Sequence, residues 1–364
     1  MISKCRACCP CVCRLVSDPR FSVVVPSYNR VDLLPETLDG ILGQQPPPHE
    51  VIVVDDGSTD GTVGMVGARY AGRVQVAAVP NGGDLAARNV GLRLACAPLV
   101  AFCDSDDVWQ PGFLAAMAAL WRAHPLTRVA FSDFRILRDG VLEPGQKFAA
   151  APADFWRGLR EVSSGSAVFD MSIVERVIGF QPFFPSCMAA DRAFLLGLGG
   201  WDTSVGRVVG TDFATILLLA EHAPFGVVRA PLVAIRKHGG NFSGDVQAMN
   251  LGDATILEHV LARRPSLAPL AARIAASAAR RRTEALDIAF ARQDFAAVRA
   301  ISALLPERGA RARLKVGVAA LPEPLRALAA RGLRAIGSAA ARRDVVDRVT
   351  PEVARGGEGR PGTQ

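Results

Sequence analysis

Short apolar runs recur through the first third of the chain, and each has the length and composition of a buried β-strand. They are FSVVV (21–25), EVIVV (50–54), RVQVAAV (73–79) and LVAF (99–102). Between these runs, apolar residues return every three or four positions, which is the period of an amphipathic helix. The segments predicted to be helical are 31–42, 60–70 and 84–96. Strands that alternate with helices indicate an α/β fold, with a mostly parallel sheet covered by helices on both faces.

Helical periodicity is also strong in the last third of the chain, within SAARRRTEALDIAFARQDFAAVRAISALL (277–305). Three polar residues, RQD (292–294), interrupt the pattern and predict a short turn between two helices. The apolar residues at helical spacing are Leu286, Ala289, Phe290, Phe295, Val298 and Ile301. We therefore expect an α/β domain at 21–245, an α-helical extension at 246–350 and a disordered tail at 351–364.

Half of the residues are hydrophobic and about a fifth are charged, which is typical of a globular protein. The charge is uneven: residues 261–344 carry 17 Lys or Arg and 6 Asp or Glu, a net charge of +11, whereas the whole chain has +7. This basic segment is either a solvated face rich in arginine or a surface that rests on anionic lipid. Aromatic residues hardly interleave with the arginines, so we expect no nucleic-acid partner.

Five of the eight cysteines lie in CRACCPCVC (5–13). Such thiols could hold zinc or acyl groups, but paired CxxC units with zinc-finger spacing are absent. We expect residues 1–20 to form a flexible, inessential extension. The stretch lacks the apolar core of a signal peptide, and no apolar run approaches the roughly 18 residues of a membrane-spanning helix. The predicted location is the cytoplasm, with peripheral attachment to the inner face of the membrane as an option.

A polar segment follows each of the four apolar runs. The segments are PSYNR (26–30), DDGSTDGT (55–62), NGGDLAARNVG (81–91) and DSDDVW (104–109). The carboxyl ends of parallel strands meet at one edge of a sheet, where ligands bind, so we expect these segments to form one site. Neither the G-x-G-x-x-G pattern of dinucleotide-binding folds nor a P-loop occurs, which disfavours both classes of nucleotide-binding protein.

Three carboxylates crowd into CDSDDVW (103–109), directly after the fourth run. Because like charges this close repel one another, a compensating cation is expected beside them. The spacing of Asp104 and Asp106 suits a hard divalent ion, Mg²⁺ or Mn²⁺, that binds few protein oxygens and completes its shell with a diphosphate. Such an ion would neutralise a leaving nucleoside diphosphate.

The residues after the first two runs suit a nucleotide. A carboxylate after the second run, Asp55 or Asp56, can accept the ring N–H of uracil, although thymine and guanine carry such a group too. Tyr28 can stack on the base. Arg30 or Arg88 can balance phosphate charge. These residue types predict a nucleotide site, with the identity of the base left open.

Read in order, FSVVVPSYNRVDLLPETLDGILGQQPPPHEVIVVDDGSTDGT, NGGDLAARNVGL and LVAFCDSDDVWQPGFL resemble the N-terminal half of family-2 glycosyltransferases. These are nucleotide-sugar-dependent enzymes with the Rossmann-like GT-A fold. The resemblance covers about residues 21–120 closely, and it continues more loosely through 197–220 and 231–243. It implies that Asp104 and Asp106 form the family's D-x-D pair, with Asp106 the more direct metal ligand. The nucleoside would be held by Pro26, Tyr28 and Asp56, whereas Asp107 would anchor the loop.

The resemblance also implies a catalytic base. Inverting members of the family use a carboxylate, usually within a Glu-Asp pair at the start of a helix after a Gly-Gly-aromatic-Asp segment. Here GGWD (199–202) is followed by Thr211 and Asp212, so Asp212 is the candidate base, and Thr211 replaces the usual Glu. The alternative for Asp212 is a helix cap before FATILLLA (213–220).

The segment RKHGGNFS (236–243) resembles the part of the family that folds back over the diphosphate. There His238 could join the metal or the phosphate, and Arg236 could add positive charge. Residues 139–190 are expected to build the acceptor side and a mobile loop.

Together these features predict an inverting, metal-dependent glycosyltransferase that moves a sugar from a nucleoside-diphosphate sugar, a UDP-sugar first, to a hydroxyl group. The expected acceptor is a cell-surface glycan or its lipid-linked precursor. One alternative is a non-catalytic scaffold that binds nucleotide-sugars, in which Thr211 marks a decayed site. The other is a sugar-1-phosphate nucleotidyltransferase, which would need a loop rich in Gly and Arg or Lys where this chain has PSYNRVD (26–32).

Overall fold

The structure of the protein is a computed structural model that describes residues 18–206, 208–238, 244–326, 328–329 and 331–332. The cysteine cluster, most of the expected N-terminal extension, the expected C-terminal tail and residues 239–243 lie outside the described residues. The chain divides into two compact units. The first comprises Met1–Gly244 and Thr255–Ser277, and the second comprises Asp245–Ala254 and Ala278–Gln364.

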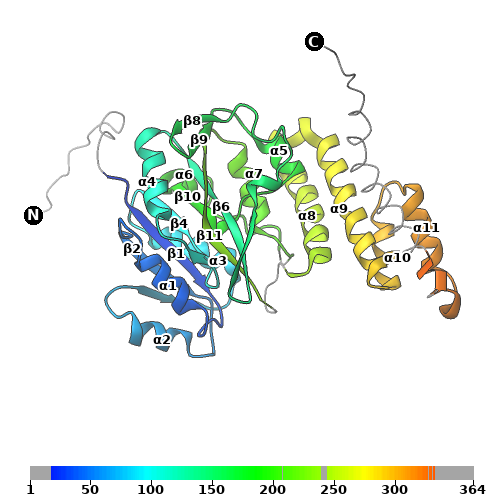
Figure 1. The fold of residues 1–364 in the computed structure, drawn as a ribbon, viewed down its shortest axis with the longest axis horizontal. Helices are drawn as coiled ribbons and strands as arrows, with labels where there is room; N and C mark the ends of the chain where they lie inside the picture. The colour runs from blue at the N-terminus through cyan, green and yellow to red at the C-terminus, as the bar shows by residue number, and fades with distance from the viewer. Residues whose placement is uncertain (1–17, 207, 239–243, 327, 330, 333–364) are drawn as a thin grey trace, which may run out of the picture. The chain divides into compact units, whose positions relative to one another are not determined.

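The first unit is built around one mixed β-sheet (Figure 1), with strand order β3-β2-β1-β4-β10-β6-β11-β9-β8. Its N-terminal half is parallel: β1 pairs with β2 and β4, and β2 pairs with β3. These strands are β1 (Phe21–Ser27), β2 (Glu50–Asp55), β3 (Gln75–Ala78) and β4 (Leu99–Phe102). The helices between them are α1 (Leu34–Leu42), α2 (Thr62–Arg69) and α3 (Asp84–Leu94). The predicted strands and helices of this region are confirmed.

The other half of the sheet combines one long parallel pair with antiparallel strands. The pair is β6 (Val129–Arg138) and β11 (Phe225–Lys237). The antiparallel strands are β5 (Val108–Trp109), β7 (Val141–Gln146), β8 (Arg160–Ser163), β9 (Ser166–Phe169) and β10 (Met188–Asp191). The helical segments are α4 (Phe113–Ala123), η1 (Phe148–Ala150), α5 (Val174–Gly179), η2 (Pro185–Cys187), α6 (Arg192–Gly197) and α7 (Asp212–Ala220).

Helices cover both faces of the sheet, as two close approaches show. Gly91 of α3 packs directly on Val24 of β1, so closely that a Cβ built on Gly91 would lie 2.3 Å from a methyl carbon of Val24. Gly226 of β11 instead faces α4, where its Cβ would lie 3.0 Å from Leu120. The strand register places Val24 and Gly226 on opposite faces of the sheet. Val24 pairs with Phe102. Its neighbour Ala101, which points to the other face, is connected through the pairings of β10 and β6 to Gly226. The predicted α/β class is therefore confirmed.

The second unit is helical. Helices α8 (Val246–Arg263) and α9 (Ala271–Ala291), with η4 (Pro265–Leu270) between them, each contribute residues to both units, whereas α10 (Phe295–Ala303) and α11 (Ala310–Ala319) lie wholly in the second. The predicted turn is confirmed: residues 292–294 separate α9 from α10, and Asp294 caps α10 by accepting the N–H of Ala297. All six apolar residues predicted for this hairpin are buried in one core.

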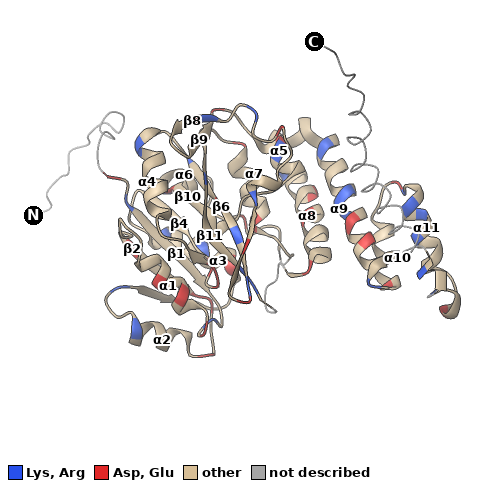
Figure 2. Ribbon diagram, viewed as in Figure 1, with Lys and Arg blue, Asp and Glu red and all other residues tan. Residues whose placement is uncertain are grey.

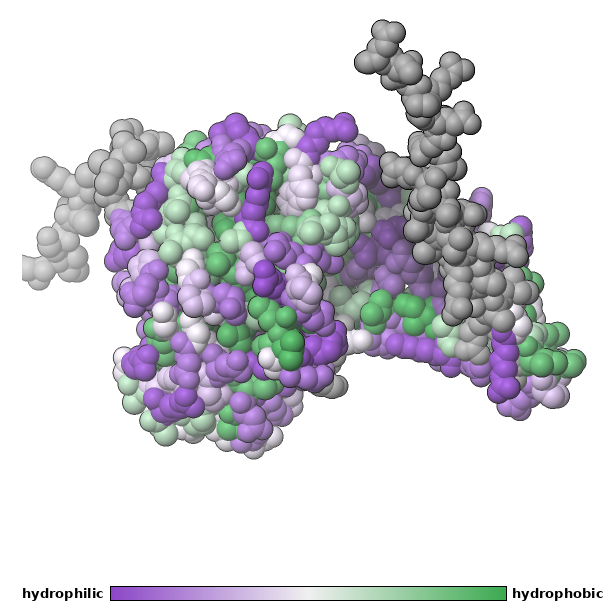
Figure 3. Space-filling model, viewed as in Figure 1, coloured by the Kyte–Doolittle hydropathy of each residue, from purple (hydrophilic) through white to green (hydrophobic). Residues whose placement is uncertain are grey.

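The surface agrees with the uneven charge of the sequence. Figure 2 shows Lys and Arg along α9 and α11 of the C-terminal region. In Figure 3, hydrophilic and hydrophobic residues are mixed over the visible face of the first unit. None of the helices in the described part of the chain is both long and apolar enough to cross a membrane.

The contact of Gly91 with Val24 generates a prediction about stability. Gly91→Ala should lower the free energy of unfolding by about 1–3 kcal/mol, because the added methyl group overpacks the α3–β1 contact. Gly64→Ala is the matched control in α2, where nothing lies within 4 Å of the added Cβ. This control should raise the free energy of unfolding by about 0.5–1 kcal/mol, because alanine is the better helix former. Urea unfolding followed by circular dichroism measures both, and equal effects of the two substitutions would contradict the close packing.

Candidate active site

The loops after β1 and β2 are fastened to each other. The backbone N–H of Asn29 donates to Ser58 Oγ at 2.8 Å, and the Asn29 side chain accepts the N–H of Thr59 at 2.8 Å. The N–H of Arg30 donates to Thr62 Oγ1 at 3.1 Å. Asn29 has a φ of 50°, a left-handed conformation that asparagine tolerates better than most residues. These bonds give the two loops one fixed edge.

Two adjacent carboxylates of the second loop have different surroundings. Asp56 is buried and accepts the backbone N–H groups of Gly82 and Gly83, at 2.7 and 2.9 Å, so it fastens the third loop to the second. Asp55 accepts the N–H of Ser58 through one oxygen, while its other oxygen is buried without a hydrogen-bond partner. Because each carboxylate oxygen has two acceptor positions, both residues retain capacity to accept a ligand N–H.

The two nucleoside residues predicted after β1 differ in exposure. Pro26 is a buried residue of β1, whereas Tyr28 follows the strand and is 48% exposed. An aromatic ring of this exposure at the rim of the loops offers a face on which a base can stack. Tyr28 therefore has the surroundings that its predicted role requires.

Arg88 of α3 is a buried residue that pairs with two carboxylates. Its guanidinium is 3% exposed, contacts Asp84 and Asp104 at 2.5 Å each, and lies 5.0 Å from the ring centre of Trp201. Burial alone would lower the pKa of Arg88, but the carboxylates of Asp104 and Asp84 raise it above its usual range. Arg88 is thus a permanent cation that balances the first carboxylate of the D-x-D pair.

Asp107 holds the loop after β4 from inside. It is buried, and its carboxylate accepts the hydroxyl of Ser186 at 2.5 Å and the backbone N–H of Arg236 at 2.9 Å. Ser186 also accepts the N–H of Asp104. Burial raises the pKa of Asp107, and the nearby carboxylates of Asp106 and Asp104 raise it further. The expected anchoring role of Asp107 is confirmed.

Asp106, on the same loop, lies amid basic residues. Its carboxylate is 14% exposed and lies 3.0 Å from His238 Nε2 and 3.7 Å from the guanidinium of Arg30. Its carbonyl oxygen accepts Arg236 Nε at 2.8 Å, and Arg236 also forms an ion pair with Glu36. The structure thus brings Asp106, His238 and Arg30 together from three separate segments.

The donor set suits a hard divalent ion that binds few protein groups. Among the residues that the structure describes, no three His, Cys, Asp or Glu side chains form a cluster able to hold a metal alone. Asp104 and Asp106 supply carboxylate oxygens, and His238 lies beside the second of them. Mg²⁺ and Mn²⁺ commonly bind one or two carboxylates and take their remaining ligands from water and phosphate, so these residues fit such an ion.

Asp212 is the first residue of α7 and is partly buried. The cap position falls on Thr211, which makes no side-chain cap hydrogen bond. Asp212 is close enough to Arg88 for its charge to raise the pKa of that residue. The candidate base and the D-x-D pair therefore share one electrostatic neighbourhood through Arg88.

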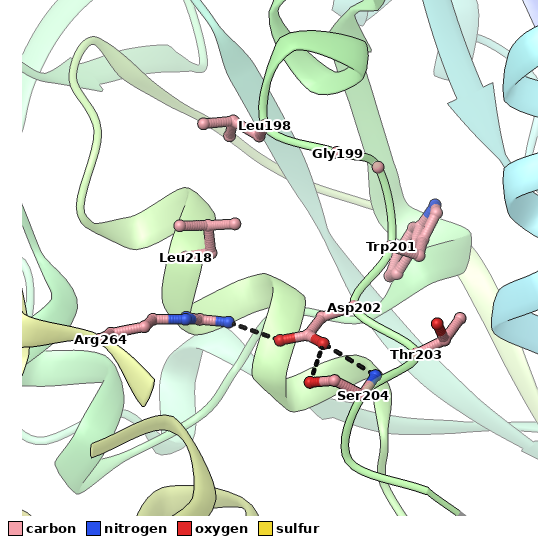
Figure 4. Close-up of a pocket in the computed structure, with 9 residues that line it drawn as sticks. Leu198, Gly199, Trp201, Asp202, Thr203, Ser204, Leu218 and Arg264 are labelled. Carbon is pink, nitrogen blue, oxygen red and sulfur yellow. Dashed lines mark hydrogen bonds and ion pairs between the residues drawn. The ribbon is translucent and has the colours of Figure 1, made fainter. Parts of the chain in front are cut away.

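The segment before Asp212 is held by a second ion pair, shown in Figure 4. Asp202 and Arg264 both line a cavity of about 280 Å³. The Arg264 guanidinium lies 2.9 Å from a carboxylate oxygen of Asp202. Arg264 also donates to the carbonyl oxygen of Ala214 in the first turn of α7, and the N–H of Asp202 donates to Thr215. Hydrogen bonds from Ser204 and the guanidinium of Arg264 outweigh burial and lower the pKa of Asp202.

Sequence reasoning missed several residues that shape this site. Ser186 lies in FFPS, a segment without recognisable periodicity, and its partners are 79 and 82 positions away in the chain. Glu36 and Arg264 resemble ordinary helix-surface residues in the sequence, and only the fold brings them to Arg236 and Asp202. No local signal marks these residues, because each acts through a partner that is distant in the chain.

Comparisons with known proteins agree with this geometry. Residues 22–168 match the family model described as Glycosyl transferase family 2. YwdF of Bacillus subtilis, named an uncharacterized glycosyltransferase, is 35% identical over 241 residues, which are 64% of this chain and 79% of YwdF. TuaG of the same organism, named for teichuronic acid biosynthesis, is 41% identical over 138 residues, 37% of this chain. The chain spans about half of the length of TuaG, 54%.

Among solved structures, residues 1–349 of TarS from S. aureus, in complex with UDP-GlcNAc, align with a TM-score of 0.51 and 22% identity. The alignment covers 66% of each chain. At this identity the similarity concerns the fold, which is the GT-A fold. Taken with the family match and with the 35% identity over most of YwdF, the sheet and its polar edge show that the chain belongs to glycosyltransferase family 2.

Proposed function

We propose that the protein is an inverting, metal-dependent glycosyltransferase that moves a sugar from a UDP-sugar to a hydroxyl of a cell-surface glycan or of its lipid-linked precursor. The observation that carries this proposal is the meeting of Asp106 with His238 and Arg30, on the loop after β4 that also carries Asp104. Such a group of side chains can hold a divalent cation and meet the phosphates of a leaving nucleoside diphosphate. The proposed place of action is the inner face of the cytoplasmic membrane.

The proposed donor site begins at the loops after β1 and β2. Tyr28 would stack on the base, and Asp56, with Asp55 beside it, would accept the ring N–H of uracil. Pro26 would lie beneath the base, since it is buried in β1. The complex of TarS with UDP-GlcNAc and the name of TuaG agree with a UDP-sugar donor and a glycan acceptor.

The diphosphate would lie beside Asp104 and Asp106, where His238 and Arg30 also approach Asp106. These residues would hold Mg²⁺ or Mn²⁺, which when bound neutralises the charge of the departing diphosphate. Arg88 is turned inward onto Asp104, so its proposed part is to fix this carboxylate and balance its charge. Arg30, 3.7 Å from Asp106, is better placed to meet phosphate oxygens.

Asp212 would act as the general base on the acceptor. The acceptor oxygen forms its bond to the anomeric carbon while the bond from that carbon to the diphosphate oxygen breaks, and the hydroxyl proton moves to Asp212. Attack opposite the departing diphosphate inverts the anomeric configuration. The contacts of Asp202 and Arg264 with α7 would keep Asp212 in place during this step.

The donor site predicts metal-dependent nucleotide binding. Calorimetry with Mn²⁺ should detect binding of UDP in preference to GDP and dTDP, and Asp106→Ala should weaken it at least tenfold, because the metal loses a ligand. Asp32→Ala, a change at an exposed acidic residue after β1, is the control and should bind UDP as the wild type does. If none of the three nucleotides binds with or without the metal, the glycosyltransferase proposal fails and a scaffold becomes the better explanation.

The proposed role of Asp212 predicts that its substitution impairs sugar transfer but not the binding of UDP. Asp212→Asn should keep the affinity for UDP and Mn²⁺ but lower the transfer rate by about 10²–10⁴, the range of general-base catalysis. The measurement is UDP release from a panel of UDP-sugars, with isolated cell-envelope glycan as acceptor. Asp154→Asn changes an exposed carboxylate elsewhere and should retain full activity. A fully active Asp212→Asn enzyme would remove Asp212 from the mechanism.

A further inference from the structure

A second cavity of about 360 Å³ lies in the first unit, beside β6 and β11, and none of the roles proposed above uses it. Pockets of roughly 300–1,000 Å³ are the usual size for small-molecule sites. The residues that give it chemical character are Asp133, Gln146, Phe148, Trp156, Val227 and Arg229. The lining thus combines charged, amide and aromatic side chains.

The strand register places this cavity at the catalytic edge of the sheet. Ala101 of β4 pairs with Ala189 of β10, which in turn pairs with Ala130 of β6. Asp104 and Asp133 each lie three positions further toward the carboxyl ends of β4 and β6. One intervening strand separates β4 from β6, which corresponds to about 10 Å. The cavity therefore begins close to the level of the D-x-D pair.

The cavity also lies on the same face of the sheet as the candidate base. Paired residues point to one face, so Phe102, the neighbour of Ala101, shares its face with Phe131, the neighbour of Ala130. Phe131 pairs with Val227, which lines the cavity. Phe102 contacts Trp201, whose chain neighbour Asp202 is bonded to α7. The helix that carries Asp212 is thus on the face where the cavity lies.

An irregularity in the long parallel pair accompanies the cavity. The register of β11 with β6 shifts between Val228 and Pro231, and again between Pro231 and Val233, opposite Asp133. Such irregularities locally interrupt pairing and re-aim side chains, often beside functional sites. Here Arg229 lies within the shifted stretch, is exposed, and forms no ion pair with any carboxylate of the described residues.

The lining combines aromatic rings with fixed polar groups. Trp156 and Phe148 lie with ring centres 4.9 Å apart. Asp133 is 1% exposed, and one of its oxygens accepts the N–H groups of Phe134 and Phe148, at 2.7 and 3.0 Å, so its carboxylate cannot rotate freely. Burial raises the pKa of Asp133, which favours a carboxyl group that meets hydroxyl groups over one that meets a metal.

A sugar ring matches this combination. A pyranose presents an apolar face of C–H groups, which packs on aromatic rings, and a rim of hydroxyl groups, which need both donors and acceptors. Asp133 supplies acceptors, Gln146 supplies both kinds of group, and Arg229 supplies donors. We propose that this cavity binds a pyranose ring of the acceptor glycan while a hydroxyl of the same glycan reaches Asp212, an inference that rests on the proposed function.

The test uses an array of immobilised oligosaccharides of defined composition, probed with the full chain in the presence of UDP and Mn²⁺. Calorimetry then gives the affinity for the most strongly bound oligosaccharide. Gln146→Ala and Arg229→Ala should each weaken this affinity at least tenfold, because each removes polar partners of the sugar. Arg93→Ala, an exposed arginine at the end of α3, is the matched control and should stay within twofold of the wild type.

Two outcomes would overturn the proposal: no oligosaccharide binds the wild type, or both cavity variants stay within twofold of it. UDP binding, measured on every variant, separates this proposal from the donor site. The cavity variants should bind UDP with wild-type affinity, since none of their changes touches the loops after β1 and β2. Failure of the wild type to bind UDP would speak against the proposed function itself, whether or not glycans bind.

Discussion

The crowding of three carboxylates after β4 is the constraint around which this edge of the protein is organised. At such short spacing Asp104, Asp106 and Asp107 repel one another, and Asp107 is also buried, which raises its pKa. Burial of charge is stabilising only when partners replace the lost hydration. Each carboxylate here has different partners, and these partners come from other parts of the chain.

Asp104 is balanced by a buried guanidinium from α3, whereas Asp107 is satisfied by neutral donors from η2 and β11. Asp106 is approached by the side chains of His238 and Arg30. In the proposed site, this division separates the carboxylates that support the loop from the one that would bind the metal. The contacts of Asp104 and Asp107 fix the loop, so that Asp106 is held in a set position. A rigid first set of contacts is what a metal and a diphosphate require for productive geometry.

The sequence predicted the parallel half of the sheet well, because each strand there is a short apolar run bounded by turn residues. It did not predict β8, β9 and β10: β9 and β10 pair with strands remote in the chain, and in the described part of the chain β8 pairs only with β9. The same limit applies to the site. Carboxylates in a dense local pattern were recognisable, but Ser186 and Arg264 acquire their roles only after folding. The inward orientation of Arg88 was likewise invisible, since an arginine on a helix gives no sign of which face it occupies.

Residues Thr255–Ser277 belong to the first unit, although they follow a segment of the second. They bring Ile256, Leu257 and Ile274 into the core of the sheet domain, and Arg264 to the loop before Asp212. The catalytic domain is therefore discontinuous in the chain, which restricts its modularity. Any exchange of the basic helices between relatives, by recombination or by design, must leave Thr255–Ser277 with the sheet. A junction drawn at residue 245 would separate the segment before Asp212 from Arg264, which braces it.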